Sequence, residues 1–297
     1  MMYDFIGDIH GHAGKLLKLL ELLGYKYSHG VYQHPNRKAF FLGDLIDGGP
    51  KIAEVLNIVI PMVNNNLAGM IMGNHEYNFL SYQTPHPSGQ GFLRSRSENH
   101  TRQCQQTLQQ LSDSEISKLL AFIWQIPLWY RAASFQAIHA CWDEAYISLL
   151  EKLASNDKLN LDLLVSSNQK DSQSYQAIEI ILKGHEVEVP SELHFSDNYG
   201  KVRSNARVCW WNEERKIIIP SKAVDTETVN KYKHAIQTQK ITIQKPTFFG
   251  HYWETGTPTI INPKAVCLDY SVAKGHYLCA YRFGGEDQLE ESNLIYV

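Results

Sequence analysis

One pattern constrains the fold of this chain most, and it occurs three times within the first 76 residues: a short apolar run, a glycine, and then carboxylate, amide or imidazole side chains. The three examples are residues 2–6 followed by Gly7-Asp8-Ile9-His10-Gly11, residues 39–42 followed by Gly43-Asp44, and residues 67–72 followed by Gly73-Asn74-His75-Glu76. Short apolar runs bounded by glycine predict buried strands. Because polar groups at the carboxyl ends of buried strands serve chemistry rather than packing, we expect these turns to converge on one rim that can hold metal.

Helical patterns separate the three strands. Residues 15–23 place leucines at helical spacing before the stop at Gly24. Pro50 suits a first helical position, and the apolar face that follows it ends before Pro61. A third helix is predicted to run from Asn74 through Leu80. Strands that alternate with helices in this way favour a sheet covered by helices.

Two long segments interrupt this regular order. Residues 83–126 begin with a stretch rich in Pro, Gly, Ser, Arg and His that lacks a clear period up to residue 102, which predicts a loop near the mouth of the site. The segment ends in a helix, since Ser112 and Glu115 have capping-box spacing and Pro127 stops the pattern. Residues 128–131 and 135–140 then predict a hairpin.

The second long segment, residues 143–235, is interpreted as a cap over the metal site. Its predicted elements are helices at 145–154 and 177–182, a polar stretch at 155–174, a turn at 196–201 and a strand at 207–211. The core resumes at 247–253, and residues 265–270 with 277–283 predict a final hairpin. We therefore expect a single domain over residues 1–297, with insertions at about 83–126 and 143–235.

The composition limits the classes of protein to consider. Charged residues make up 20% and apolar residues 43% of the chain, and the net charge of −3 gives no support for a nucleic-acid partner bound through a broad basic face. Five scattered cysteines without CxxC spacing predict reduced thiols. No signal-peptide pattern and no run of roughly 18 apolar residues is found, so the expectation is a cytoplasmic protein without a membrane partner.

The order of the motifs GD.HG, GD..D.G and GNHE over residues 7–76, followed by isolated histidines, resembles the calcineurin-like metallophosphoesterases. More narrowly, it resembles the branch that contains Ser/Thr protein phosphatases and bacterial diadenosine-tetraphosphate hydrolases. The resemblance implies an α/β (α+β) fold in which two β-sheets pack face to face and are flanked by helices. It places the site at the carboxyl ends of the strands.

The resemblance also implies two divalent metal ions, for which mixed carboxylate, amide and imidazole donors suit Mn, Fe or Zn. The implied ligands are Asp8 and His10 for the first ion, Asp44 as the bridge, and Asn74, His139 and His251 for the second. His185 follows a helical pattern rather than a strand and is held in reserve as a further ligand. Each downstream histidine has an alternative interpretation as a core or turn residue.

The implied reaction is attack of a hydroxide that bridges the metals on a phosphate ester or anhydride. By resemblance, His75 would protonate the leaving oxygen or stabilise the transition state, and Asp47 would orient His75. The implied substrates are a phosphorylated small molecule, a dinucleoside polyphosphate or other nucleotide, or alternatively a phosphoprotein. A hypothesis from another class is a catalytically silent binding module.

The sequence departs from the family at Gly48, where the family carries an arginine that binds phosphate. A glycine supplies no charge, so another arginine is needed for this role or the metals carry more of the phosphate. The candidates in the inserted segments are Arg94, Arg96, Arg203 and Arg207, for which a solvated or structural role is the alternative. Trp142 and Trp253 lie within three residues of predicted metal histidines and are candidates to stack on an aromatic group, with core packing as the alternative.

Overall fold

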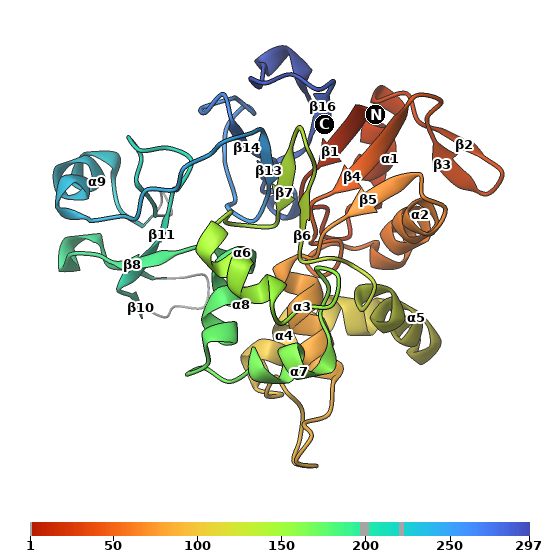
Figure 1. The fold of residues 1–297 in the computed structure, drawn as a ribbon, viewed down its shortest axis with the longest axis horizontal. Coiled ribbons are helices and arrows are strands. Elements are labelled where there is room, and N and C mark those ends of the chain that lie inside the picture. Colours follow the sequence, from red (N-terminus) through yellow and green to blue (C-terminus); the bar gives the residue numbers. More distant parts are fainter. Residues whose placement is uncertain (1, 197–201, 220–222) are drawn as a thin grey trace.

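The computed structural model describes residues 2–196, 202–219 and 223–297, and its centre is a pair of packed β-sheets (Figure 1). The first sheet has the order β15 (Asp269–Tyr270), β16 (Tyr277–Phe283), β1 (Met2–Ile6), β4 (Arg37–Phe41) and β5 (Ala68–Met70), with β17 (Leu294–Tyr296) also paired to β16. The second has the order β14 (Ala265–Cys267), β13 (Thr247–Phe249), β7 (Gln136–Ile138) and β6 (Trp129–Arg131).

Strands β1, β4 and β5 run parallel in register, so their carboxyl ends lie at the same edge of the first sheet. Each is followed by a helix: α1 (Ala13–Leu22) after β1, α2 (Ile52–Asn64) after β4 and α3 (Asn74–Gln83) after β5. The predicted alternation of strand and helix is therefore confirmed. It brings the three polar turns to one place in the molecule.

The two sheets face each other across an aromatic core. Phe5 on β1 stacks on Phe248 on β13, with ring centroids 3.7 Å apart and an interplanar angle of 7°. Phe135 and Phe283 approach Phe248 edge-on, and all four rings are buried. The predicted fold class, two sheets packed face to face and flanked by helices, is thus confirmed.

This core gives a direct test of the packing. Replacing Phe248 with leucine keeps the site apolar but removes the partner of Phe5, so we expect the free energy of unfolding to fall by about 1–3 kcal/mol. Urea denaturation of the full chain measures the change. The matched control is Tyr27→Leu, at a side chain that is 65% exposed, which should change stability by less than about 0.5 kcal/mol. Equal stability of Phe248→Leu and the wild type would contradict the stacked arrangement.

Several local predictions were wrong, and in each case burial outweighs the local pattern. Helix α2 continues past Pro61 to Asn64, because Met62 is completely buried beyond the proline. Helix α4 (Glu98–Gln110) begins inside the stretch predicted as a loop. The polar stretch after residue 155 contains helix α7 (Leu161–Ser166), which is anchored by two buried leucines.

The predicted final hairpin is also wrong in part. Strand β14 pairs with β13 in the second sheet, whereas β15 pairs with β16 in the first. The chain changes sheets at Leu268, whose N–H donates to the carbonyl of Phe249. The hairpin of β2 (Lys26–Ser28) and β3 (Val31–Gln33) between α1 and β4 was not predicted at all.

The two insertions differ in how they join the body of the molecule. Helices α4, α5 (Asp113–Ile123), α6 (Glu144–Glu151) and α8 (Gln173–Lys183) pack beside the sandwich and add apolar side chains to its larger core. The predicted helices at 112–127, 145–154 and 177–182 correspond to α5, α6 and the second half of α8.

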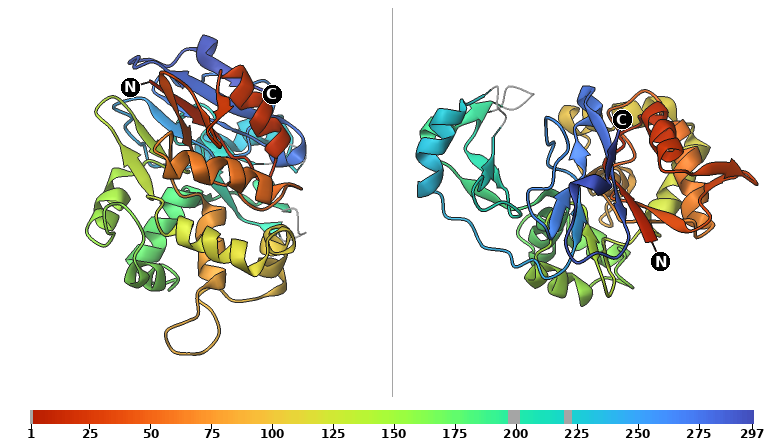
Figure 2. Two further views of the ribbon diagram at one scale, coloured as in Figure 1. Left: turned by 90° about the vertical axis from the view of Figure 1, so that its right-hand side faces the viewer. Right: turned by 90° about the horizontal axis from the view of Figure 1, so that it is seen from above.

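A small lobe follows α8 and stands to one side of the sandwich (Figure 2). It contains β8 (Glu186–Glu188), β9 (Phe195–Ser196), β10 (Val202–Arg203), β11 (Asn205–Val208), β12 (Ile217–Ile218) and α9 (Thr226–Tyr232). Its own core consists of Val189, Leu193, Ala206, Ile217 and Ile236. Most of the turn predicted at 196–201 lies outside the described residues, and the strand predicted at 207–211 is instead β11. The assignment of residues 1–297 to one domain stays a prediction.

Two further observations concern the composition. All five cysteines are buried and free, in agreement with the prediction of reduced thiols. Within the described ranges, every helix is too short or too polar to cross a lipid bilayer.

Candidate active site

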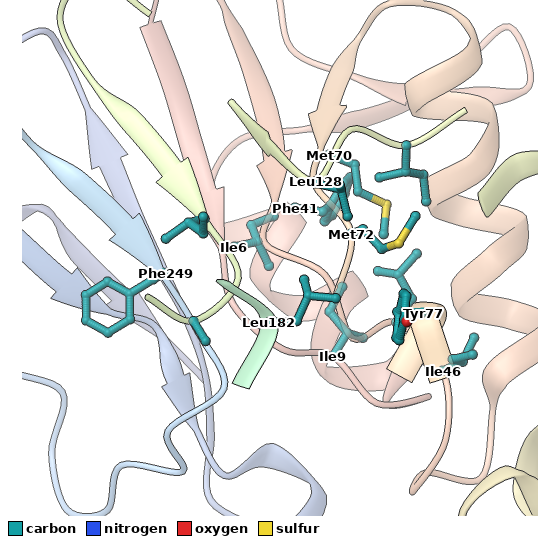
Figure 3. Close-up of a cluster of buried hydrophobic side chains, with 14 of the residues drawn as sticks. Ile6, Ile9, Phe41, Ile46, Met70, Met72, Tyr77, Leu128, Leu182 and Phe249 are labelled. Atoms are coloured by element: carbon teal, nitrogen blue, oxygen red, sulfur yellow. The ribbon is translucent and has the colours of Figure 1, made fainter. Parts of the chain in front are cut away.

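The turns after β1 and β4 are anchored by buried apolar side chains. Ile9 lies between Asp8 and His10 and points into the core, as does Ile46 between Asp44 and Asp47 (Figure 3). Because these isoleucines are completely buried, they fix the turns that carry the polar residues. The anchoring core combines side chains from β1, β4 and β5 with Leu182 of α8 and Phe249 of β13.

The backbone of the turns is strained at the polar positions. His10, Asp44, Asp47 and His251 all have positive φ angles, of 45°, 52°, 64° and 71°. Such angles are uncommon for residues other than glycine, cost of the order of 1–3 kcal/mol each, and cluster at functional sites. The packing of two sheets holds these residues in place.

Gly43 shows how closely the second and third turns approach each other. Its φ angle is 96°, and a Cβ atom there would lie 2.5 Å from the backbone of Gly73. A side chain at either glycine would push Asp44 away from Asn74. The glycines that follow the second and third apolar runs are therefore required by this contact.

One set of donor atoms surrounds His139. The Nδ1–H of His139 donates to the carbonyl of Leu42 at 2.7 Å, which turns Nε2 toward the site. That nitrogen lies 3.4 Å from Asp44 Oδ2 and 3.1 Å from Asn74 Oδ1. His251 Nδ1 lies 2.7 Å from the same Asn74 oxygen. Imidazole nitrogens, a carboxylate oxygen and an amide oxygen thus converge on one place, a donor set that can hold a cation.

The electrostatics at His139 lead to the same conclusion. Burial opposes protonation of His139, but the neighbouring Asp44 outweighs it and raises the pKa of His139 to about 10. The site therefore draws positive charge to this position. His251 is buried as well, and its Nε2 atom has no hydrogen-bond partner among the described residues. Imidazole, carboxylate and amide oxygen form a donor set that suits a divalent transition metal.

A second set of donor atoms surrounds His10. Its Nδ1–H donates to the carbonyl of Ile46 at 3.0 Å, so Nε2 faces Asp44 Oδ2 at 3.7 Å and Asp8 Oδ2 at 3.9 Å. Asp8 in turn accepts a hydrogen bond from the backbone N–H of His251. Burial and the nearby Asp269 raise the pKa of Asp8 well above its usual range. A cation would offset the electrostatic repulsion between these buried carboxylates.

The two sets share one residue. Within the part of the chain that the structure describes, two groups of carboxylate and imidazole side chains have donor atoms that all lie within 4.8 Å of one another: His10, Asp44 and His75, and Asp44, His139 and His251. Asp44 belongs to both groups, which is the position expected of a bridge. Four of the six predicted ligands, His10, Asp44, His139 and His251, belong to these groups. Of the other two, Asp8 lies 3.9 Å from His10 Nε2 and Asn74 lies 3.1 Å from His139 Nε2.

His75 is held by a chain of hydrogen bonds beside these donors. Its Nδ1 lies 2.7 Å from Asp47 Oδ2, and the other oxygen of Asp47 accepts a short hydrogen bond from the hydroxyl of Thr107. Burial opposes protonation of His75, but Asp44 and Asp47 raise its pKa to about 9. His75 therefore carries a proton at neutral pH. Thr107 lies on α4 and was missed, because no motif marks it in the sequence.

Asp269 is a second residue that the sequence reasoning missed. Its carboxylate accepts hydrogen bonds from the backbone N–H groups of Trp253 and Ser271, at 2.8 and 2.9 Å. It is buried and close enough to Asp8 to affect the pKa of that residue. A signal was present, because Asp269 follows an apolar strand just as Asp8 does.

Glu76 ties two of the turns together. Its carboxylate accepts hydrogen bonds from the backbone N–H groups of Asp44 and Leu45, both at 2.8 Å, and of Gly73 at 3.1 Å. These bonds fix the orientation of Asp44 relative to Asn74. Glu76 is 1% exposed and so has no access to a ligand of its own.

The role of Glu76 can be tested by Glu76→Gln, which keeps the shape but replaces one acceptor oxygen with an NH₂ group. Because supporting hydrogen bonds orient metal ligands, we expect the affinity for Mn²⁺ to fall roughly 10–100-fold. Titration calorimetry with Mn²⁺ measures this change. Glu54→Gln on the exposed face of α2 is the matched control. An unchanged affinity in Glu76→Gln would show that the turns hold Asp44 without this carboxylate.

The remaining candidates lie in different surroundings. His185 lies 2.8 Å from Asp143 through Nε2 and stands outside both groups of donor atoms. Arg94 donates to Asn78 and Gln103, Arg96 is exposed and stacks over Phe92, and Arg203 lies on the exposed strand β10. Arg207 differs from these, because its guanidinium lies 4.5 Å from the ring centroid of Trp253.

Trp142 and Trp253 also differ in their surroundings. Trp142 is 4% exposed and donates to Glu144, as a core residue does. Trp253 is 44% exposed, and its ring centroid lies 6.4 Å from that of His251. Trp253 is therefore the tryptophan that borders the site.

A two-sheet sandwich with clustered metal donors at its strand ends defines a class of metal-dependent hydrolases, and comparison with known proteins identifies the family. The profile of the calcineurin-like phosphoesterases matches residues 1–189. The chain belongs to this family, as its motifs predicted. Membership implies divalent metal ions as cofactors.

Several relatives are similar over a shorter stretch. The bis(5'-nucleosyl)-tetraphosphatases PrpE of Halalkalibacterium halodurans and Anoxybacillus flavithermus are 45% and 46% identical over 76 residues, which is 25% of this chain and 31% of each relative. The match thus spans about a third of the length of these relatives. A protein serine/threonine phosphatase from Saccharomyces cerevisiae has the same fold, with a TM-score of 0.51 and 14% identity over 100% of this chain and 79% of its own.

Proposed function

We propose that this protein is a metal-dependent phosphoesterase that hydrolyses a phosphate ester or anhydride with two divalent cations, Mn, Fe or Zn. The observation that carries the proposal is the position of Asp44, which belongs to both groups of donor atoms. Asp8 and His10 would hold one cation, and Asn74, His139 and His251 the other. When bound, the cations supply positive charge to the phosphate oxygens and lower the pKa of water toward ~7.

The protein's own residues would then orient the substrate and move a proton. His75 carries a proton at neutral pH, and its Nε2 atom faces the site at 3.9 Å from Asp44 Oδ2. We assign it to donate this proton to the leaving oxygen as the bond to phosphorus breaks. Asp47 and Thr107 hold the opposite side of the ring, so that Nε2 keeps its direction.

Arg207 is the candidate to replace the arginine that is absent at Gly48. Its guanidinium lies 4.5 Å from the ring centroid of Trp253, and that centroid lies 6.4 Å from the centroid of His251. A Cβ atom at Gly48 would lie 3.6 Å from the Cβ atoms of Ala273 and His10. Among the four predicted arginines, Arg207 has the position that best suits a phosphate oxygen.

For the substrate, we favour a dinucleoside polyphosphate or a related nucleotide. The support is the 76-residue similarity to bis(5'-nucleosyl)-tetraphosphatases, which covers only part of each chain. A phosphoprotein is the alternative. The test is a comparison of kcat/KM for diadenosine tetraphosphate and for a phosphotyrosine peptide, combined with elemental analysis of the purified protein.

We expect about two metal ions per chain and a preference for the nucleotide. A clear preference for the peptide would overturn the substrate assignment but leave the phosphoesterase in place. A protein without metal after growth in Mn-supplemented medium, and without turnover of either substrate or of p-nitrophenyl phosphate, would instead support a catalytically silent binding module.

A further inference from the structure

An exposed tryptophan beside the metal donors holds two cationic side chains. The guanidinium carbon of Arg207 lies 4.5 Å from the ring centroid of Trp253, and the ammonium nitrogen of Lys274 lies 4.9 Å from it. Lys274 ends the short 3₁₀ helix Val272–Lys274, which follows β15, whereas Arg207 lies on β11 of the small lobe. Two distant segments of the chain therefore bring positive charge to one ring.

These two cations lack a neutralising partner. Over residues 2–196, 202–219 and 223–297, neither Arg207 nor Lys274 forms an ion pair or a side-chain hydrogen bond with the protein. Glu186 and Asp269 act on the half-buried Arg207 only from a distance, and burial lowers the pKa of its guanidinium. Both cations lie within 5 Å of the centroid of one ring, and an anion bound there would supply the opposite charge.

The backbone fixes the position of the pair relative to the metal centre. Trp253 is two residues beyond His251, and its N–H donates to the buried carboxylate of Asp269 at 2.8 Å. Its φ angle of 52° is unusual for a bulky residue, so the loop is held in a strained conformation that presents the indole at the mouth of the site. Lys274 follows Ala273, the residue that faces Gly48.

Arg207 also borders an open pocket of about 480 Å³ that is lined by α8 and the segments on both sides of it. The charged residues of this lining are Lys170 and Lys183 together with Asp171, Glu179 and Glu186. A volume of this size lies within the range of small-molecule sites. The pocket offers room for the part of a substrate that lies beyond its phosphate groups.

We propose that Lys274 and Arg207, held in place by Trp253, bind the phosphate groups beyond the scissile one in an anhydride-linked phosphate chain. The inference rests on the proposed function and names its substrate class, a nucleoside polyphosphate rather than a simple monoester. The two cations contact phosphate oxygens, and Trp253 is a positioning residue that holds them at the mouth of the metal centre.

The first test compares substrates of different length. For the wild type, Lys274→Gln and Trp253→Ala, kcat/KM is measured for diadenosine tetraphosphate and for p-nitrophenyl phosphate. We expect the ratio of the two values to fall at least tenfold in both variants, chiefly through KM for the tetraphosphate. Trp253→Phe keeps a ring face and should retain a ratio within about threefold of the wild type. Lys118→Gln on α5 is the matched control. An unchanged ratio in Lys274→Gln and Trp253→Ala would overturn the inference.

A second measurement does not depend on turnover. The Mg²⁺ complex of inorganic tripolyphosphate is titrated into the metal-loaded full chain, with orthophosphate as the comparison ligand. We expect Lys274→Gln to weaken tripolyphosphate binding about tenfold. Because Lys274 is exposed, this variant should fold normally. Equal binding by Lys274→Gln and the wild type, or no binding by the wild type, would refute the phosphate site even if the protein hydrolyses p-nitrophenyl phosphate. Tripolyphosphate binding without any turnover would instead refute the proposed function alone.

Discussion

Asp44→Asn is expected to remove nearly all phosphoesterase activity while leaving the fold intact. Asp44 is the residue common to both groups of donor atoms, and its Oδ2 atom lies 3.4 Å from His139 Nε2 and 3.7 Å from His10 Nε2. Loss of the bridging charge should cost several kcal/mol of transition-state stabilisation, which corresponds to roughly 10³-fold in kcat for p-nitrophenyl phosphate. Elemental analysis should show that Asp44→Asn contains less metal per chain than the wild type.

The amide in Asp44→Asn can still accept the hydrogen bond that Asp44 Oδ1 receives from the backbone of His75, so the local turn is preserved. Circular dichroism checks this point. The matched control is Asp287→Asn at an exposed position, which should keep full activity and metal content. Wild-type turnover in Asp44→Asn would show that hydrolysis takes place elsewhere in the protein.

His75→Gln is expected to lower kcat by roughly 10²–10⁴-fold with metal content near that of the wild type. The structural reason is that His75 is the protonated side chain beside the donors, held in place by Asp47 at 2.7 Å. A proton donor matters most when the leaving group is basic. The decrease in kcat should therefore be larger for phenyl phosphate than for p-nitrophenyl phosphate. Measuring kcat of the wild type and the variant with both substrates tests this expectation.

His234→Gln provides the control for this substitution, because His234 is exposed and lies near α9 of the small lobe. If His75→Gln reduces turnover of both esters equally and also loses metal, then His75 supports the metal centre and is not the proton donor. Retained activity with both esters would remove His75 from the mechanism.

The sequence predicted the parts of the molecule in which local pattern and tertiary structure agree. Strands β1, β4 and β5 could be found because each is an apolar run that ends at glycine, and the same turns carry Asp8, Asp44 and Asn74. The parallel register then places these turns at one edge. Family resemblance supplied His139 and His251, which have no local signal beyond their position after a strand.

Contacts between segments that are distant in the chain could not be predicted from the sequence. Thr107 lies 60 residues from Asp47, on a helix with two buried residues and otherwise polar character, so no periodicity links it to the site. The division of residues 265–270 between two sheets depends on hydrogen bonds to β13 and β16 that no local pattern encodes. The same holds for Lys274 and Arg207, which meet only through Trp253.

The proposed metal ligands come from both sheets of the sandwich: Asp8, His10, Asp44 and Asn74 follow strands of the first, and His139 and His251 follow strands of the second. Ions held between them would act as a cross-link that exists only in the native state. By mass action, such a link adds about 2.7 kcal/mol of stability when the free ion is at 100 times its Kd. The lifetime of the folded protein in a cell would then follow the supply of the metal, and metal starvation would reduce its abundance as well as its activity.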